Sequence, residues 1–170
     1  MNAITANYLS KAEIWLLGTI LLYFLMNGAQ LFETAVLVPK WIARPPESFG
    51  LLADKNGMSL KAFWIIFHSI HEVVFIAAIV FCWKLGAVRN WLLVLFAVHF
   101  LVRVWTLSYF APNIIEFQKI AETSASATDL VKRANLWKTL NYIRVGLFIG
   151  VSMALVPLYF KLLELNRSID

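Results

Sequence analysis

The chain has 170 residues, of which 61% are hydrophobic and 15% are charged, and its mean hydropathy is +0.72. A soluble domain of this length does not carry so much apolar surface, because it needs a solvated exterior. The net charge of +5 does not predict nucleic-acid binding, since the basic residues are scattered without a cluster or a basic motif. We expect them to contact anionic lipid headgroups instead.

Four apolar stretches are each long enough to cross a membrane as a helix, at about 14–39, 60–83, 91–110 and 134–163. The first contains Asn27, Gln30 and Glu33 and has no small-residue cleavage site, so we interpret it as a retained span and not as a signal peptide. The four spans account for the chain. The sequence therefore predicts an all-α fold with one domain, residues 1–170, which is an integral membrane four-helix bundle.

The connections between the spans differ in length and in charge. Loop one, 40–59, carries the turn signal Arg44-Pro45-Pro46, and loop two, 84–90, is short enough to make spans two and three antiparallel neighbours. The third connection, 111–133, begins near Pro112 and predicts a short amphipathic helix on the membrane surface or capping the bundle. More basic residues flank loops one and three, which predicts that these loops face the cytoplasm of a bacterial-type inner membrane.

Polar and ionisable side chains recur on one face of each span. A charged side chain at the centre of a membrane helix costs roughly 2.5–3.5 kcal/mol, so such residues usually face a bundle interior and act there. The stripes are Tyr23, Asn27, Gln30 and Thr34 with Glu33 beside them, then His68, His71 and Glu72, then His99, Arg103 and Thr106, and finally Trp137, Asn141 and Arg144. All four stripes lie at a similar depth, which predicts one shared cavity beneath loops one and three.

These residue types favour metal-free acid–base chemistry on a small lipophilic molecule. A histidine paired with a carboxylate, such as His68 or His71 with Glu72, is a general base near neutral pH, and an arginine stabilises the anion that proton removal leaves. The predicted catalytic residues are His68, His71, Glu72, Glu33, Arg103 and Arg144. The predicted substrate-binding residues are Tyr23, Asn27, Gln30, His99, Trp105, Trp137 and Asn141. The predicted substrate is aromatic or quinone-like, and no cofactor is predicted.

Three alternatives stay open at this point. One is a metal-dependent membrane oxidoreductase that holds iron, copper or zinc with Glu33, His68, His71, Glu72 and His99. Another is a protein that binds a lipid, a quinone or an ion without catalysis. In the third, the polar side chains only join the helices to one another. The expected partners are membrane lipid and a small hydrophobic ligand, with no nucleic acid, and a homo-oligomer is left open.

Parts of the sequence resemble the anthrone-oxygenase-like membrane proteins. The similar segments are Glu33 followed by Val38-Pro39-Lys40-Trp41, the step Pro112-Asn113, and the segment 134–144, in which Trp137, Asn141 and Arg144 lie. The resemblance implies a four-helix membrane fold and the oxygenation of polycyclic phenolic anthrones without an obvious cofactor. The triplet His68, His71 and Glu72 is richer in ionisable groups than expected of that family, so the substrate need not be shared.

Overall fold

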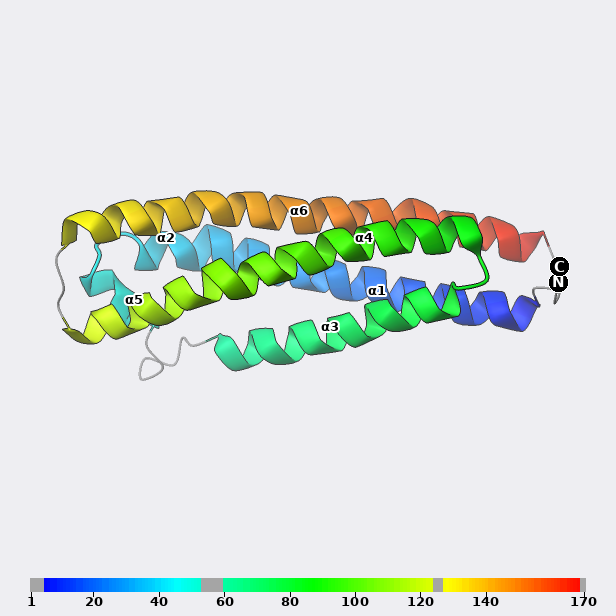
Figure 1. Ribbon diagram of the computed structural model, residues 1–170, viewed down its shortest axis with the longest axis horizontal. Helices are drawn as coiled ribbons and strands as arrows, with labels where there is room; N and C mark the ends of the chain where they lie inside the picture. The colour runs from blue at the N-terminus through cyan, green and yellow to red at the C-terminus, as the bar shows by residue number, and fades with distance from the viewer. Residues whose placement is uncertain (1–4, 53–59, 124–126, 169–170) are drawn as a thin grey trace. The chain divides into compact units, whose positions relative to one another are not determined.

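Figure 1 shows the computed structural model of the protein, which describes residues 5–52, 60–123 and 127–168. Within these ranges the chain is helical apart from short turns, and no strand occurs. The elements are α1 (Ala6–Phe32), η1 (Glu33–Leu37), α2 (Val38–Trp41), η2 (Glu47–Leu52), α3 (Lys61–Phe81), α4 (Gly86–Trp105), η4 (Thr106–Phe110), α5 (Ala111–Thr123) and α6 (Ala127–Arg167). The predicted all-α fold is confirmed.

Four helical stretches are long and apolar enough to cross a membrane, namely Ala6–Trp41, Lys61–Phe81, Gly86–Ala121 and Asp129–Arg167. Each overlaps one of the predicted spans. Large apolar side chains such as Ile14, Val73 and Leu101 are exposed on these helices. A soluble protein rarely leaves so many exposed, whereas lipid solvates them without penalty. The protein is therefore a multi-pass membrane protein built as a four-helix bundle, and the cytoplasmic placement of loops one and three stays a prediction.

Three prolines lie inside these helices without ending them, Pro157 in α6 and two that follow π turns. Pro39 follows the last residue of the π-helix η1 by two residues, and Pro112 follows η4 in the same way. A proline lacks the N–H that the carbonyl four residues earlier needs, and its ring crowds that carbonyl. In both π turns the residue before the proline bonds to a carbonyl five residues back, and this adjustment lets a membrane helix continue. Spans one and three therefore pass their predicted ends at 39 and 110, and α5, the predicted amphipathic helix, follows η4 without a loop.

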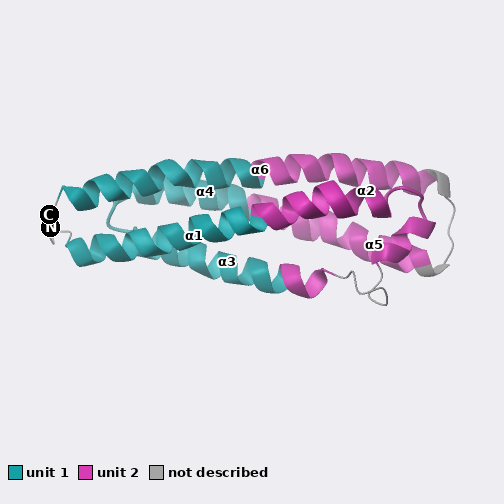
Figure 2. Ribbon diagram, turned by 180° about the vertical axis from the view of Figure 1, so that it is seen from behind, with its two compact units in different colours: residues 1–26, 65–100, 148–170 teal, residues 27–64, 101–147 magenta. Residues whose placement is uncertain are grey.

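The residues form two compact units, which Figure 2 colours separately. Unit 1 comprises Met1–Met26, Ile65–Phe100 and Phe148–Asp170, and unit 2 comprises Asn27–Trp64 and Leu101–Leu147. Each of the four spans contributes a segment to each unit. The two units are described one at a time below.

Unit 1 is held together by an inward-facing stripe on each helix. Buried positions recur every three or four residues, which is the spacing of one helix face. In α1 they are Leu9, Ala12, Leu16, Ile20 and Tyr23. In α3 the buried stripe contains both His68 and His71 and continues with Phe75. The histidines of α3 therefore occupy core positions of unit 1.

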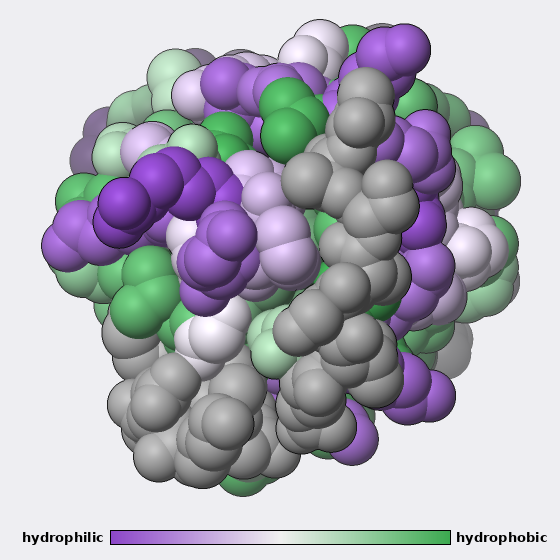
Figure 3. Space-filling model, turned by 90° about the vertical axis from the view of Figure 1, so that its left-hand side faces the viewer, coloured by the Kyte–Doolittle hydropathy of each residue, from purple (hydrophilic) through white to green (hydrophobic). Residues whose placement is uncertain are grey.

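Unit 2 contains an aromatic core near the start of α6. Phe117 stacks on Phe49 with ring centroids 4.6 Å apart, and Trp41 packs edge-on to Trp137 at 5.1 Å. The indole N–H of Trp137 donates to the carbonyl of Phe110 at 3.3 Å, so this buried polar atom is paired. Hydrophilic side chains gather on the surface at this end of unit 2, with hydrophobic ones between them (Figure 3).

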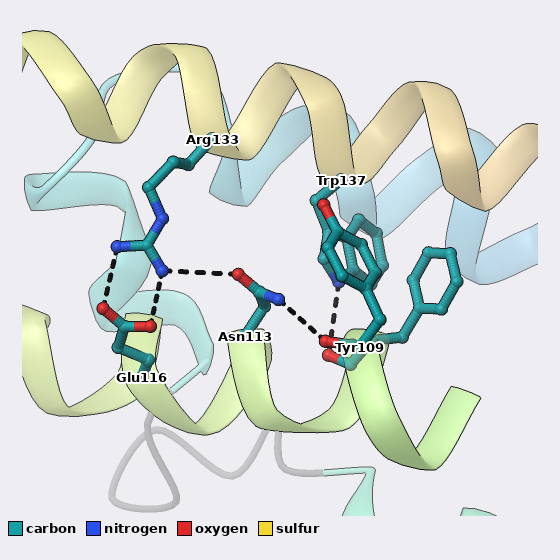
Figure 4. A network of polar contacts seen from close by, with 6 residues as sticks. Tyr109, Asn113, Glu116, Arg133 and Trp137 are labelled. Atoms are coloured by element: carbon teal, nitrogen blue, oxygen red, sulfur yellow. Dashed lines mark hydrogen bonds and ion pairs between the residues drawn. The ribbon is translucent and has the colours of Figure 1, made fainter. Parts of the chain in front are cut away.

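A polar network joins α5 to α6 beside the aromatic core (Figure 4). The guanidinium of Arg133 donates to both carboxylate oxygens of Glu116, at 2.7 and 2.5 Å, and to the amide oxygen of Asn113 at 3.3 Å. The amide nitrogen of Asn113 donates to the carbonyl of Tyr109 at 2.8 Å. The ion pair is partly exposed and adds little stability. Its effect is to fix α5 against α6, so Asn113, part of the Pro112-Asn113 step, has a structural role here.

Candidate functional site

A chain of hydrogen-bonded side chains links three helices within unit 1. The phenol oxygen of Tyr23 in α1 lies 2.5 Å from Nδ1 of His99 in α4. The other ring nitrogen of His99, Nε2, lies 2.9 Å from Oε2 of Glu72 in α3. Both distances fall in the range of hydrogen bonds. We call these three residues the Tyr–His–Glu chain.

One arrangement of protons satisfies both contacts of the chain. With the Glu72 carboxylate ionised, the Nε2–H of a neutral His99 donates to it. Nδ1 of the same ring is then an acceptor, and the hydroxyl of Tyr23 donates to it. The ionised carboxylate, which can only accept, thus sets the tautomer of His99, and His99 in turn fixes the orientation of the carboxylate.

Glu72 is the accessible end of the Tyr–His–Glu chain. Its side chain is 29% exposed, whereas that of His99 is fully buried. Around Glu72 the exposed positions of α3 include the apolar residues Val73 and Ile76. A partly exposed carboxylate within a membrane span is costly, and such residues mark functional sites. The carboxylate is therefore positioned to meet a molecule that arrives through the lipid.

Aromatic rings surround the buried end of the chain. The ring of His71 stands edge-on to Tyr23 with centroids 4.3 Å apart. Phe75 and Phe148 lie 5.8 and 5.7 Å from the ring of His99. Surroundings of low polarity strengthen a hydrogen bond relative to water and make an unpaired partner costly. The rings therefore hold Tyr23 and His99 in the paired arrangement.

A second polar group, within unit 2, centres on Arg144 of α6. Its guanidinium donates to the amide oxygen of Asn141 at 2.6 Å and lies 4.3 Å from the centroid of the Phe110 ring. The amide nitrogen of Asn141 donates to the hydroxyl of Thr34 in η1 at 2.9 Å. Glu33 of η1 lies near enough for electrostatic interaction with Arg144. The buried guanidinium is thus held by an amide and an aromatic face.

The other predicted polar residues of unit 2 lie inside it or at its edge. Arg103 is half-buried, and its charge also acts on Arg144. Asn27 and Gln30 are buried. Among the described residues, Oε1 of Gln30 and Nε of Arg144 have no hydrogen-bond partner. The interior of unit 2 therefore contains one acceptor, on Gln30, and one donor, on Arg144, that the described protein atoms do not satisfy.

The two tryptophans predicted to line a substrate pocket pack against the aromatic core of unit 2. The ring centroid of Phe110 lies 5.1 Å from that of Trp105 and 5.4 Å from that of Trp137. These contacts are those of interior packing, with favourable edge-to-face geometry. Both residues therefore stabilise the helices around η4, and their role toward a substrate stays a prediction.

The described contacts form one group of predicted residues within each unit, and the single cavity shared by all of them stays a prediction. The group in unit 1 comprises Tyr23, His71, Glu72 and His99, with His68 buried in the same stripe of α3. The group in unit 2 comprises Glu33, Thr34, Arg103, Asn141 and Arg144.

The described part of the chain contains no cluster of ligands for the alternative metal centre. There, no group of three or more His, Cys, Asp or Glu side chains is placed to hold a metal ion together. Of the five alternative ligands, Glu33 belongs to unit 2 and the others belong to unit 1. The prediction of an iron, copper or zinc site therefore gains no support from the arrangement.

The pairing of Glu72 with His99 was not predicted from the sequence. The sequence paired Glu72 with His68 or His71 of its own helix, where spacing alone brings side chains to one face. The contact with His99 joins residues 27 positions apart on two helices. Helical periodicity shows that both residues lie on inward faces, but their contact depends on how α3 and α4 are rotated about their axes.

The fold and these contacts define a multi-pass membrane protein with two buried polar groups, one of which is a hydrogen-bonded Tyr–His–Glu chain. Comparisons with protein-family models, with curated proteins and with solved structures found no match to this chain. The resemblance to the anthrone-oxygenase-like proteins therefore stays a prediction.

Proposed function

We propose that the protein is a membrane enzyme in which Glu72 removes a proton from a small lipophilic molecule. The observation that supports this most strongly is the Tyr–His–Glu chain, with its buried phenol and imidazole and its accessible carboxylate. The substrate class is an aromatic or quinone-like compound with an acidic O–H or C–H bond, such as a phenol, a hydroquinone or an anthrone. Such compounds dissolve in the bilayer and reach Glu72 from its exposed side.

In this mechanism Glu72 is the general base. A carboxylate has two acceptor oxygens with about four lone-pair positions, so the bond from His99 leaves capacity for the substrate proton. His99 and Tyr23 are positioning residues: the imidazole orients the carboxylate, and the phenol holds the imidazole ring by a hydrogen bond to Nδ1. A positioned general base contributes roughly 10²- to 10⁴-fold to a rate.

The reaction that follows proton removal is proposed from the resemblance. An anthrone that has lost a proton is an electron-rich anion that reacts with O2. The overall oxygenation of the anthrone consumes one O2 and yields the anthraquinone and one water, with the proton that Glu72 removed returned to the departing oxygen. The anion-stabilising roles predicted for Arg103 and Arg144 are not needed here, since the proposal depends on unit 1 alone.

A structural role for the Tyr–His–Glu chain is the competing interpretation. The chain links α1, α3 and α4, and hydrogen bonds between membrane helices add roughly 0.6 kcal/mol each to stability. Such small energies do not explain why a carboxylate is left exposed on α3. The two interpretations differ in what substitution of His99 does to turnover.

Substitution of His99 by leucine tests the proposal. Purified protein in detergent micelles is supplied with anthrone and O2, and O2 uptake and anthraquinone formation are recorded. We expect turnover by the wild-type protein and a kcat about 10- to 100-fold lower in His99→Leu at unchanged KM, because the carboxylate loses its orienting partner but the binding surface remains. His99→Gln keeps one donor and one acceptor and is expected to restore part of kcat.

Size-exclusion chromatography and far-UV circular dichroism check that both variants are folded. Equal kcat in the wild-type protein and in a folded His99→Leu would contradict the proposal. So would the absence of turnover when the wild-type protein is given anthrone, a naphthohydroquinone and a lipophilic naphthol in turn.

A further inference from the structure

An open groove lies in unit 2 where α2 ends and α6 begins. Its volume is about 920 Å³. One wall follows the chain from Pro39 through the turn that contains Arg44 to Glu47, the first residue of η2. The other wall is a single face of α6, made of Val131, Asn135, Lys138 and Tyr142, which recur at the spacing of one helix face. None of these residues takes part in the Tyr–His–Glu chain.

The lining of the groove contains two cationic residues and one acidic residue. Arg44 and Lys138 lie on opposite walls, and Glu47 is the single acidic residue of the lining. Among the described residues, neither the guanidinium of Arg44 nor the ammonium of Lys138 forms an ion pair. The groove therefore carries a positive charge for which the described protein supplies no partner.

The turn that carries Arg44 is fixed by local hydrogen bonds. The backbone N–H of Arg44 donates to the hydroxyl of Ser48 at 3.0 Å, and that hydroxyl donates to the carbonyl of Trp41 at 2.7 Å. These bonds hold the turn at the end of α2. Arg44 is thus displayed from a defined backbone, and its long side chain is exposed.

The position of the groove near the ends of the membrane helices and the residues that line it indicate an amphiphilic ligand. Arg44 follows the end of the span Ala6–Trp41, and Lys138 lies in the third turn of the span Asp129–Arg167, so both are near the ends of membrane helices, where lipid phosphates lie. The remaining lining includes Pro39 and Val131, which are apolar. Tyr142, one helical turn deeper than Lys138, is exposed. A free phosphate would leave these apolar side chains uncovered, whereas the acyl chain of a phospholipid would pack against them.

We propose that this groove binds the phosphate headgroup of an anionic phospholipid between Arg44 and Lys138, with an acyl chain against the apolar side chains of the lining. Basic pockets beside membrane helices recognise anionic headgroups by charge. The site is separate from the Tyr–His–Glu chain, and its existence does not depend on the proposed enzyme activity.

Native mass spectrometry of the full chain in mild detergent tests this proposal. The protein is titrated with dioleoyl phosphatidylglycerol and, separately, with dioleoyl phosphatidylcholine. We expect preferential binding of phosphatidylglycerol, and a loss of about 10- to 30-fold in its affinity when Arg44→Gln and Lys138→Gln are combined. The matched control combines Lys40→Gln with Lys132→Gln, which removes the same charge from exposed positions of unit 2 outside the groove, and is expected to bind as the wild-type protein does.

Three outcomes would overturn the proposal. The first is equal binding of the two lipids by the wild-type protein. The second is unchanged phosphatidylglycerol binding in the folded groove variant. The third is complete displacement of the lipid by an equal concentration of inorganic phosphate, which would identify a soluble phosphate as the ligand. Lys138→Arg, which keeps the charge, is expected to keep the affinity.

Discussion

Replacement of Glu72 by glutamine is expected to lower kcat for anthrone by about 10²- to 10⁴-fold without unfolding the protein. The glutamine amide oxygen still accepts a hydrogen bond from Nε2 of His99, which lies 2.9 Å from the carboxylate. The amide cannot accept the substrate proton. The loss corresponds to about 2.7–5.4 kcal/mol of transition-state stabilisation. Steady-state O2 uptake in detergent, measured at saturating anthrone, gives kcat directly.

Ser69→Ala is the matched control for this substitution. Ser69 lies one turn before Glu72 on α3, is exposed, and donates only to the carbonyl of Ile65 in its own helix. Its loss is expected to leave kcat and stability unchanged. A Glu72→Gln protein that is folded and turns over anthrone at the wild-type rate would show that the carboxylate is not the base.

Replacement of Asn141 by leucine is expected to lower the free energy of unfolding by about 2–3 kcal/mol. Asn141 accepts from Arg144 at 2.6 Å and donates to Thr34 at 2.9 Å. A hydrogen bond to a charged group contributes roughly 1.5–3 kcal/mol, and a neutral bond between membrane helices contributes roughly 0.6 kcal/mol. The substitution also leaves the buried guanidinium without its amide partner. Unfolding by increasing mole fractions of sodium dodecyl sulfate measures the difference.

Thr139→Ala provides the comparison on the same helix. Thr139 is exposed, and its hydroxyl bonds to the carbonyl of Asn135 within α6. We expect a change within about 0.5 kcal/mol. If Asn141→Leu unfolded at the wild-type detergent fraction, Asn141 would not stabilise unit 2, and its predicted role in orienting a substrate would become the better explanation.

The spans could be predicted from the sequence because they depend on local composition. Twenty or so apolar residues form a membrane helix whatever they pack against, since every backbone polar group must be paired within the segment. The effect of Pro39 and Pro112 could not be predicted in the same way. Proline usually ends or kinks a helix, and only the structure shows the π turns that carry both helices past them.

The inward faces of the polar stripes could also be predicted, but their partners could not. Periodicity placed Glu72 and His99 inside, and it placed Asn141 and Arg144 on one face of the last span. Which inward residues meet depends on helix rotation and on the unit to which each segment belongs. His71 is an example. Its ring packs edge-on against Tyr23 of another helix, with ring centroids 4.3 Å apart, and helical periodicity does not predict that contact. The groove at Arg44 had no sequence signal, since its two walls come from distant segments.

Nitrogen NMR of histidine-labelled protein tests most directly whether His99 connects Tyr23 to Glu72. The protein contains three histidines, and the signals of His99 are those that disappear in His99→Gln. We expect its Nε2 to be protonated and its Nδ1 to accept a hydrogen bond, with Tyr23→Phe shifting the Nδ1 signal and Glu72→Gln shifting the Nε2 signal. Signals of His99 that stay the same in both variants would contradict the connection on which the proposed base depends.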